Sequence, residues 1–324
     1  MNEDIAVSVM CICYNQVDYV ADALDSFLAQ ETSFPFEILV NDDASTDGTT
    51  EVLLDYERRF PERVRVVTHE ENQYSKGIYP WGTFLLPRAR GRYVALCEGD
   101  DFWCDPTKLQ RQFDVMEADP SLTACVHASV NVVASSGKRF SALHFYDRDR
   151  AVDLEDLFQQ VQCFATNSLF VRADDLRAYR SSPIQPLAAD GDHKLTLFFA
   201  STRGGMYYID REMSAYRLFA KNSINRTMML SPRHDEIVRR KHEGRVELLR
   251  AVDKFTSGAH HEGVERGIDS MDYALYKDLR DYRELRRRWP ERLAAESLPS
   301  KANLFLYTYC RPLHRLAYGL YCRL

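Results

Sequence analysis

Residues 5–13 of this 324-residue chain, IAVSVMCIC, form an almost uninterrupted apolar run that leads into Tyr14 and Asn15. A strand this apolar is buried on both faces, which is typical of a central strand in a parallel sheet. Parallel strands need long crossover connections, usually helices, and these cover the faces of the sheet. The run therefore predicts an α/β fold in which strands and helices alternate.

The alternation continues through the first hundred residues. Further strand patterns lie at residues 36–40, 64–68 and 93–97. Helix patterns with an apolar side lie between the strands, at residues 18–30, 49–59 and 81–89. This order is that of a doubly wound sheet, in which ligands bind beyond the carboxyl ends of the strands. Asn15, Asp43 and Asp100 each follow a strand, so we expect them along one edge.

Three carboxylates follow the fourth strand within four positions: Glu98, Asp100 and Asp101. Like charges at a strand end repel one another and raise the cost of ionisation. A hard cation such as Mg²⁺ or Mn²⁺ relieves that conflict and leaves coordination positions open for phosphate. The alternative is an acidic turn that caps the next helix. Asp105 before Pro106 already supplies such a cap, so the three acids favour a metal site.

Beyond residue 106 the pattern is less regular. We expect helices over residues 106–118, 153–160 and from Asp192 to about 200. We expect strands over residues 122–133, 166–171 and 206–209. From about residue 232 the chain reads as helical and charged, with breaks at Pro290 and Pro299.

Composition argues against several classes of protein. No stretch approaches 18 uninterrupted apolar residues, so no membrane-spanning helix is predicted. The eight cysteines contain no C-x-x-C pair, which argues against a disulfide scaffold and a zinc site. The acidic start of the chain runs straight into a strand, so we expect no secretory signal and a cytoplasmic protein.

Charge differs between the two parts of the chain. Residues 1–220 hold 21 Lys and Arg against 34 Asp and Glu, whereas residues 221–324 hold 21 against 14. The acidic first part argues against nucleic acid as a partner. The basic, aromatic tail over residues 301–324 suits an interfacial helix on anionic lipid, such as the inner face of the plasma membrane. Docking of the same tail on the catalytic domain or on a second subunit is the alternative, and the oligomeric state is open.

Four motifs in order resemble the bacterial family-2 glycosyltransferases, in particular a branch associated with cell-surface polysaccharides. They are VSVMCICYN, FEILVNDDASTDGTTEVL, HEENQYSKG and ARGRYVALCEGDDFWCDPTKLQRQ, and the resemblance covers about residues 5–220. It implies the GT-A fold, in which helices flank a mostly parallel central sheet. The expected catalytic domain spans residues 1–225, with a nucleotide-binding half to about 105 and an acceptor half from about 106. A helical extension over 226–324 follows.

The resemblance also implies a nucleotide site. Asp43 matches the acid that holds the nucleotide base, and a carboxylate suits the N3–H donor of uracil or thymine. Asp42 is expected to support the ribose. Capping of the helix at Thr49 is the alternative for both acids. The remaining nucleotide-binding positions that the resemblance implies are Ile12, Asn15, Asn72 and Lys76, although a solvated loop is the alternative for the last two.

Glu98-Gly99-Asp100 stands where the family has an Asp-x-Asp motif. The resemblance therefore implies Asp100 as the direct ligand of Mn²⁺ or Mg²⁺, with Glu98 in support through water or ribose. Arg217 is expected to reach the pyrophosphate. Phe219 replaces the family's usual histidine, so the metal or phosphate contact that a histidine would make from this position is lost. Asp101 and Trp103 are candidates for sugar or acceptor contact, and Trp103 is equally well explained as a buried aromatic.

Inversion at the anomeric carbon requires a base for the acceptor hydroxyl. Gly191-Asp192 matches the family's pair at the start of a helix, so Asp192 is the expected general base. Asp190 is the second candidate for that role. Both acids could instead be helix caps.

These features together predict a metal-dependent, inverting hexosyltransferase that acts on a bacterial surface glycan, such as lipopolysaccharide or capsule. UDP is the default nucleotide, followed by dTDP and then GDP, whereas the sugar, the acceptor and the linkage are not indicated. A nucleotidyltransferase is the alternative enzyme, but the Gly-rich loop of that class is absent after the first strand. A non-catalytic sugar-nucleotide binder is the third possibility.

Overall fold

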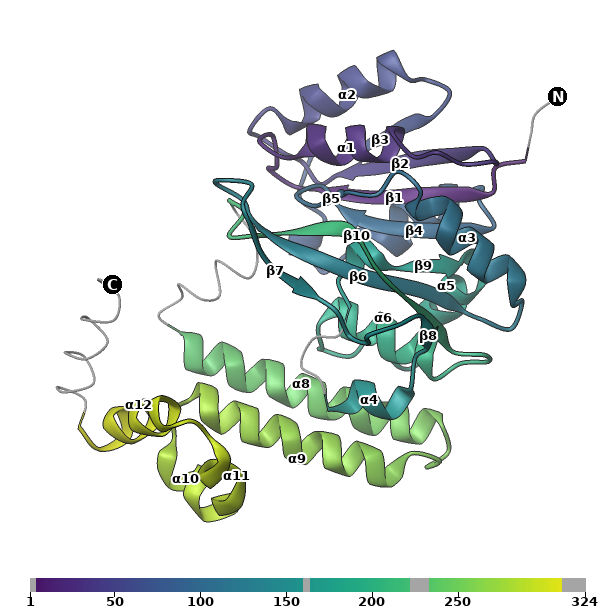
Figure 1. Cartoon of the computed structure of the whole chain (residues 1–324). Helices are drawn as coiled ribbons and strands as arrows, with labels where there is room; N and C mark the ends of the chain where they lie inside the picture. The colour runs from purple at the N-terminus through teal and green to yellow at the C-terminus, as the bar shows by residue number, and fades with distance from the viewer. Residues whose placement is uncertain (1–3, 160–163, 222–232, 311–324) are drawn as a thin grey trace. The chain divides into compact units, whose positions relative to one another are not determined.

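The computed structural model describes residues 4–159, 164–221 and 233–310 (Figure 1). The chain divides into two compact units. The first consists of residues 1–157 and 162–231, and the second of residues 158–161 and 232–324. The predicted end of the catalytic domain at residue 225 lies outside the described residues.

The first half of the first unit has the predicted alternation of strands and helices. Its strands are β1 (Val7–Cys13), β2 (Phe36–Asp42), β3 (Val64–Thr68) and β4 (Tyr93–Glu98). They pair in parallel in the order β3-β2-β1-β4. The main connecting helices are α1 (Val20–Leu28) and α2 (Thr49–Arg59). Between β3 and β4 lie η1 (Tyr74–Lys76), η2 (Trp81–Leu85) and η3 (Leu86–Arg88). The last two are consecutive, so the region expected to be helical over 81–89 is helical from Trp81 to Arg88, as a π-helical turn followed by a 3-10 turn.

The second half extends the same sheet with mixed strand directions. Its strands are β5 (Phe102–Trp103), β6 (Ala124–Val133), β7 (Arg139–Leu143), β8 (Arg150–Ala151), β9 (Phe170–Arg172) and β10 (Met206–Leu218). The order continues from β4 as β9-β6-β10-β5, and β6 and β10 are parallel while β9 is antiparallel to both of its neighbours. The accompanying helices are α3 (Lys108–Ala118), α4 (Leu154–Phe158), α5 (Ala173–Arg180) and α6 (Gly191–Ala200).

Two predictions for this half are corrected. Residues 166–168 form a short helical turn, η4 (Thr166–Ser168), so the strand expected from residue 166 begins at Phe170. Strand β10 continues to Leu218, well beyond the predicted end at residue 209, because it pairs with β6 over two stretches separated by a register shift. This longer strand carries Arg217 into the sheet.

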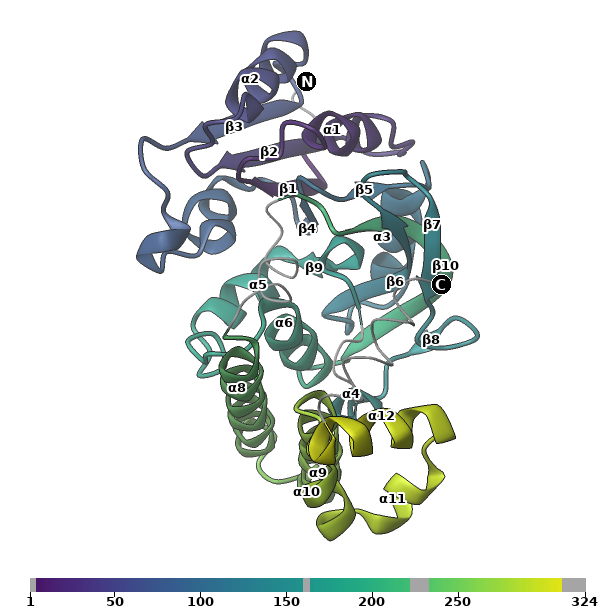
Figure 2. The same cartoon turned by 90° about the vertical axis from the view of Figure 1, so that its left-hand side faces the viewer.

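The two faces of β4 are covered by different helices. Alternate residues of the strand, such as Ala95 and Cys97, belong to one core with the apolar sides of α1, α2 and α3. Leu96 points to the opposite face, where it lines a cavity with Leu176 of α5 and Leu195 of α6. Helices α5 and α6 lie side by side there (Figure 2). Glu98 is two residues after Leu96 and therefore points to the α6 face.

The second unit consists of helices. They are α8 (His234–Phe255), α9 (His261–Asp278), α10 (Tyr282–Arg288), α11 (Pro290–Ala295) and α12 (Leu298–Tyr309). Pro290 begins α11 and Pro299 lies in the first turn of α12, as expected for proline at a helix start. A small core gathers around Trp289 and Leu304. Within the described residues, none of the helices has the length and apolar character needed to cross a membrane.

Gly91 allows β4 to lie against β1, and we predict that Gly91→Ala destabilises the first unit. A Cβ at this position would lie 2.4 Å from Ser8 N and 2.6 Å from Val7 C, and neither backbone atom can move aside alone. Overpacking of this kind costs about 1–3 kcal/mol, measurable as a lower free energy of unfolding in urea.

Gly82→Ala is the matched control, because its Cβ would meet only the flexible side chain of Arg180. A Gly91→Ala protein as stable as Gly82→Ala would show that the close approach of β4 to β1 is not constrained as described.

Candidate active site

The carboxyl ends of three neighbouring strands are level with one another. Ile12 of β1 is paired in register with Asn41 of β2 and with Glu98 of β4. Just beyond, Gly99 N donates to Ile12 O at 2.9 Å, and Asp43 N donates to Cys13 O at 2.9 Å. Asp43 and Asp100 therefore leave the sheet at the same edge, as the strand pattern predicted.

Asn15 and Asp42 organise the loops at this edge. Asn15 adopts a left-handed φ of 52°, and its side-chain oxygen accepts a hydrogen bond from Thr46 N at 2.8 Å. Asp42 is 1% exposed and accepts hydrogen bonds from Ser45 Oγ at 2.5 Å and from the Thr50 hydroxyl. Asp42 therefore fixes the turn between β2 and α2 through side-chain hydroxyls, whereas the N-cap residue of α2 is Gly48 and no side-chain cap hydrogen bond occurs there.

Asp43 anchors the loop that carries the other predicted nucleotide ligands. One carboxylate oxygen accepts from Gln73 N at 2.7 Å and the other from Tyr74 N at 3.0 Å. Asn72 Nδ2 donates to Asp43 O at 3.2 Å. Lys76 lies at the end of the same loop in an ion pair with Glu71. The structure therefore brings Asp43, Asn72 and Lys76 together in one segment.

Glu98, Asp100 and Asp192 form a group that we call the carboxylate cluster. Burial, then the charge of Asp100 and to a lesser extent that of Asp192, raise the pKa of Glu98 to about 8, against a lowering by a hydrogen bond with Thr166. Burial likewise raises the pKa of Asp100, although Arg217 and a hydrogen bond with Gln16 oppose that change. Asp192, 94 positions further along the chain, is close enough to add to the pKa rise of Glu98, although its contribution is smaller than those of burial and of Asp100.

The turn within Glu98-Gly99-Asp100 admits only glycine at its centre. A Cβ on Gly99 would lie 2.4 Å from Cys13 Sγ and 2.6 Å from Gln16 Oε1. Gln16 Oε1 is buried and has no hydrogen-bond partner among the described residues. An unpartnered amide oxygen beside two crowded carboxylates is an environment that suits a hard cation. No group of three or more His, Cys, Asp or Glu side chains with metal-binding geometry occurs in the described part of the chain.

Arg217 is held beside the cluster by acidic partners. Its guanidinium donates to Asp100 O at 2.9 Å and pairs with Asp22, while its ring contacts include Phe102 at 4.6 Å. Arg217 N donates to Asp101 Oδ1 at 2.8 Å. Arg217 thus lies beside Asp100, and its expected contact with the pyrophosphate stays a prediction.

Asp101 and Trp103 lie in the interior and do not face the open edge. Asp101 is 2% exposed, and its second oxygen accepts from Asn167 Nδ2 at 2.8 Å. Trp103 is 4% exposed, with its ring 4.5 Å from that of Phe27 and Lys108 Nζ 4.1 Å from its centre. Because both side chains are buried, the expectation that they contact the sugar or the acceptor is corrected. The buried-aromatic alternative describes Trp103.

Asp192 occupies the first turn of α6, and Asp190 is the N-cap residue of that helix. The Asp192 side chain is 23% exposed, and its Oδ1 accepts from His193 N at 2.9 Å. The neighbouring His193 side chain is 5% exposed and is therefore interior. The Asp192 carboxylate is thus partly open to solvent, and its expected role as general base stays a prediction.

Sequence reasoning missed Tyr79, which touches this site. Its hydroxyl lies 2.8 Å from the position that a Cβ on Gly191 would take. Burial raises the Tyr79 pKa, and the charges of Tyr179, Glu98 and Asp192 contribute to the rise. Gln16 and Thr166 were missed as well. Their proximity to the cluster depends on contacts between distant segments, so no local pattern could have revealed it.

The family model of glycosyl transferase family 2 matches residues 8–185. An uncharacterized Mycobacterium tuberculosis protein, Rv1520, is 40% identical over 149 residues, which are 45% of this chain and 42% of that protein. The putative teichuronic acid biosynthesis glycosyltransferase TuaG of Bacillus subtilis is 42% identical over 111 residues, or 34% of this chain and 41% of TuaG. The chain thus spans less than half the length of these curated relatives.

Two solved structures share the fold. The S. aureus TarS fragment 1–349 in complex with UDP-GlcNAc superposes with a TM-score of 0.58 at 17% identity, covering 94% of this chain and 91% of that chain. The mannosyltransferase PcManGT from Pyrobaculum calidifontis, in complex with GDP-Man and Mn²⁺, gives a TM-score of 0.53 at 17% identity, covering 97% and 87%. These similarities confirm the predicted fold class.

The raised pKa of Glu98 predicts a pH-dependent stability. Between its ordinary value of 4.5 and about 8, folded Glu98 holds a proton that the unfolded chain has lost. The free energy of unfolding should therefore fall as pH rises through that window. Glu98→Gln removes the titration, so without metal the variant should be more stable than wild type near pH 8.5 and similar near pH 5. One pKa unit corresponds to about 1.4 kcal/mol, so urea unfolding in EDTA can resolve the difference.

Asp55→Asn is the control, because Asp55 is about half exposed in pairs with Arg58 and Arg59. If wild type and Glu98→Gln have the same pH dependence, the carboxylate cluster is not buried and crowded as described.

Proposed function

The chain belongs to glycosyl transferase family 2, and from this premise we propose that it moves a sugar from a nucleotide-diphosphate donor to a hydroxyl of a bacterial surface glycan. The observation that carries the proposal is the carboxylate cluster, in which Glu98 at the end of β4 and Asp100 just after it lie at the same strand edge as Asp43, and Asp192 acts electrostatically on Glu98. The similarity to TuaG, a putative glycosyltransferase of teichuronic acid biosynthesis, supports a surface-glycan acceptor. The UDP-GlcNAc bound by TarS supports UDP as the first nucleotide to test.

Donor binding is proposed along the edge formed by β2, β1 and β4. Asp43 and Asn72 lie in one loop cluster at the end of β2, with Asn15 and Ile12 at the end of β1. A carboxylate near the base and amide groups near the sugar are the donors and acceptors that a uridine needs. Arg217 beside Asp100 places a cation where the diphosphate would meet the cluster.

A divalent metal ion, Mn²⁺ or Mg²⁺, is proposed at Asp100, with Glu98 in support. The crowded carboxylates and the unpartnered Gln16 oxygen fit such an ion. When bound, the ion would neutralise the charge that develops on the departing nucleotide diphosphate. The Mn²⁺ in the PcManGT complex is consistent with this assignment in the same fold.

Asp192 is proposed as the general base of an inverting displacement. The acceptor hydroxyl would give its proton to the Asp192 carboxylate as its oxygen attacks the anomeric carbon. The bond between that carbon and the diphosphate oxygen would break with its electron pair remaining on the leaving group. Because attack and departure occur on opposite faces of the sugar, the anomeric configuration inverts.

We predict that Asp192→Asn abolishes turnover and preserves donor binding. Loss of a general base typically lowers the rate by about 10²–10⁴-fold. The readout is release of UDP from UDP-glucose and UDP-N-acetylglucosamine with a surface-glycan acceptor and Mn²⁺. The rise in melting temperature that UDP with Mn²⁺ produces should be the same in the variant and in wild type.

Asp190→Asn is the matched control, two residues away at the N-cap of the same helix, and it should retain most of the turnover. Equal loss in both variants would contradict the assignment of the base. A wild-type protein that binds UDP-sugars but releases no UDP would favour the non-catalytic binder. Formation of a sugar nucleotide from a sugar phosphate and UTP would favour the nucleotidyltransferase.

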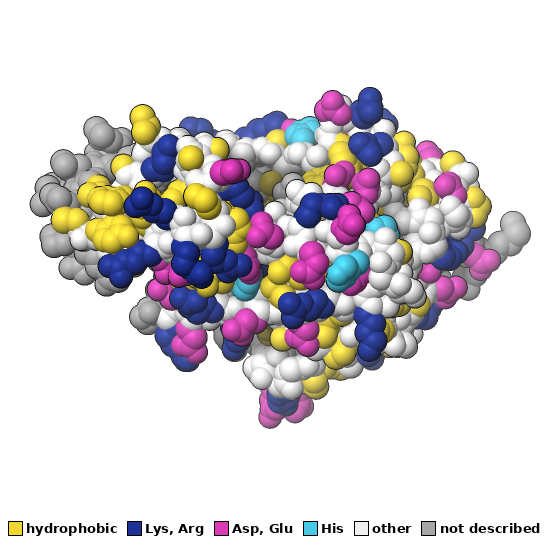
Figure 3. All heavy atoms as spheres, turned by 90° about the horizontal axis from the view of Figure 1, so that it is seen from below, with side chains coloured by type: hydrophobic (Ala, Val, Ile, Leu, Met, Phe, Trp, Pro, Cys, Tyr) yellow, Lys and Arg dark blue, Asp and Glu magenta, His cyan; other side chains and the backbone are white. Residues whose placement is uncertain are grey.

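Peripheral attachment to the inner membrane face is proposed through α12. Leu304 of this helix is buried in the core of the second unit, whereas Phe305 and Tyr309 are 48% and 47% exposed. Arg283 lies 5.1 Å from the Tyr309 ring, so basic and aromatic groups share the exposed side. Figure 3 shows hydrophobic and basic side chains together over this end of the second unit. Of the predicted tail over residues 301–324, the part after residue 310 lies outside the described residues.

Phe305→Ser with Tyr309→Ser should reduce flotation of the protein with phosphatidylglycerol vesicles, because both rings leave the lipid interface. Phe140→Ser is the control, since Phe140 is 70% exposed on β7 of the other unit. Membrane attachment through α12 would be refuted if the double variant floated as well as wild type.

A further inference from the structure

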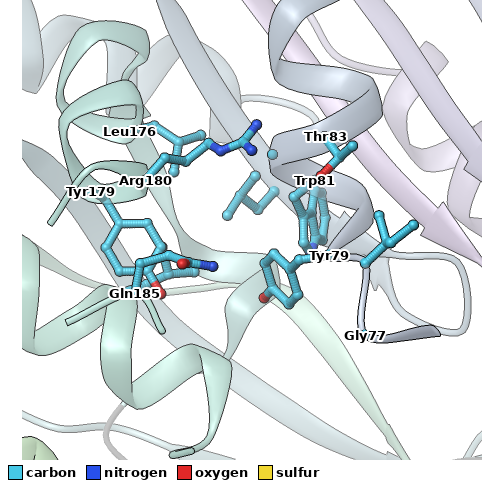
Figure 4. A pocket seen from close by; sticks show the side chains of 12 residues that line it. Gly77, Tyr79, Trp81, Thr83, Leu176, Tyr179, Arg180 and Gln185 are labelled. Carbon is cyan, nitrogen blue, oxygen red and sulfur yellow. The ribbon is translucent and has the colours of Figure 1, made fainter. Parts of the chain in front are cut away.

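A cavity of about 340 Å³ lies on the α6 face of the sheet in the first unit (Figure 4). Its volume is at the lower end of the range of roughly 300–1,000 Å³ that small-molecule sites occupy. Its walls come from η2 and the residues before it, from β4, and from α5 and α6. The residues that line the cavity include Tyr79, Trp81, Leu96, Tyr179, Arg180 and Leu195.

The cavity adjoins the carboxylate cluster. Leu96 of its wall and Glu98 of the cluster lie two residues apart on the same face of β4. Leu195 and Asp192 are three residues apart on α6 and therefore share one side of that helix. Tyr79 completes the connection, because its hydroxyl lies against Gly191. A molecule in the cavity would thus sit next to the proposed base.

Arg180 is an exposed arginine that lines this cavity. No ion pair or hydrogen bond of its side chain occurs within the described residues, whereas Arg177 on the same helix pairs with Asp174 at 2.7 Å. The guanidinium reaches over Gly82, where a Cβ would lie 2.9 Å from Arg180 Nε. Glycine at residue 82 therefore leaves room for the arginine to extend across the cavity, as Figure 4 shows.

The remaining walls are aromatic and apolar. Tyr79 and Trp81 lie on one side of the cavity, and Tyr179 lies on the other (Figure 4). Aromatic rings with a polar tip pack against the apolar face of a sugar ring and can still hydrogen-bond its hydroxyls. A guanidinium binds carboxylate or phosphate oxygens in a bidentate manner. Together these walls suit a saccharide ring with one anionic group.

We propose that this cavity is an acceptor subsite for a saccharide that carries a carboxylate or a phosphate, with Arg180 as the residue that binds the anion. The inference rests on the proposed function, because Asp192 takes the proton of the acceptor and the cavity lies on the Asp192 side of the cluster. A uronic acid and a sugar phosphate offer the same chemistry to Arg180. The two are distinguished by the ligands of the test.

The test is calorimetric titration of the full chain, saturated with UDP and Mn²⁺, with three ligands. These are methyl β-D-glucuronide, glucose 6-phosphate and the neutral methyl β-D-glucoside. A charge-assisted hydrogen bond should make at least one anionic ligand bind about tenfold more tightly than the neutral one. The tighter of the two anions identifies the acceptor class. Arg180→Gln should reduce the preference to about twofold or less, and Arg177→Gln should keep it.

Gly82→Ala supplies a second variant that retains the positive charge. Its methyl group displaces the guanidinium, so the preference for the anion should fall although Arg180 is present. Equal affinity of wild type for all three ligands would overturn the subsite, as would equal loss in Arg177→Gln and Arg180→Gln. UDP affinity is measured beforehand, by titrating UDP with Mn²⁺ into each nucleotide-free protein. If wild type does not bind UDP, the result counts against the proposed function itself. If wild type binds UDP but shows no preference for the anionic ligands, the result counts only against the subsite.

Discussion

The burial of charge at the end of β4, where Glu98 and Asp100 are largely withdrawn from water, is the constraint on which the rest of the site depends. Burial disfavours ionisation of Glu98 and Asp100, and the charge of Asp192 adds to the effect on Glu98. A protein that holds such groups together without a cation accepts lower stability at neutral pH. The fold can maintain the arrangement because the backbone on both sides is fixed, by β1–β4 pairing on one side and by α6 on the other.

The surrounding structure restrains this cluster through contacts that leave little freedom. Gly99 lies against Cys13 and Gln16, so the turn between the two acids is determined by close packing. Asp101 holds both Asn167 and the backbone of Arg217, which joins β4 to η4 and β10. The buried Asp101 therefore has a positioning role, whereas the proposed base, Asp192, is partly open to solvent. Preorganisation of this kind is what stabilisation of developing charge requires.

Much of the site could be predicted from the sequence because parallel strands impose a simple rule. Asn15, Asp43 and Asp100 each follow an apolar strand, so the topology alone places them at one edge. The roles of Asp42 and Trp103 could not be predicted from the sequence. A pair of adjacent acids gives the same pattern whether it forms a turn or binds a ligand, and an aromatic residue after an acidic run gives the same pattern whether it is buried or contacts a sugar. Arg180 and Tyr79 belong to segments about one hundred residues apart. Their common cavity exists only after folding and leaves no local pattern in the sequence.

The convergence of Asp43, Asp100 and Asp192 on one active site can be tested most directly by crystallography. Crystals of the full chain are grown with UDP and Mn²⁺, and anomalous data are collected at the manganese edge. We expect one strong peak beside Asp100, bridged to the diphosphate, with uridine at the Asp43 loop and Asp192 across from the ion. An anomalous peak remote from Asp100 would contradict the convergence of these acids on one active site. Binding of the nucleotide at a place that Asp192 does not border would contradict it as well.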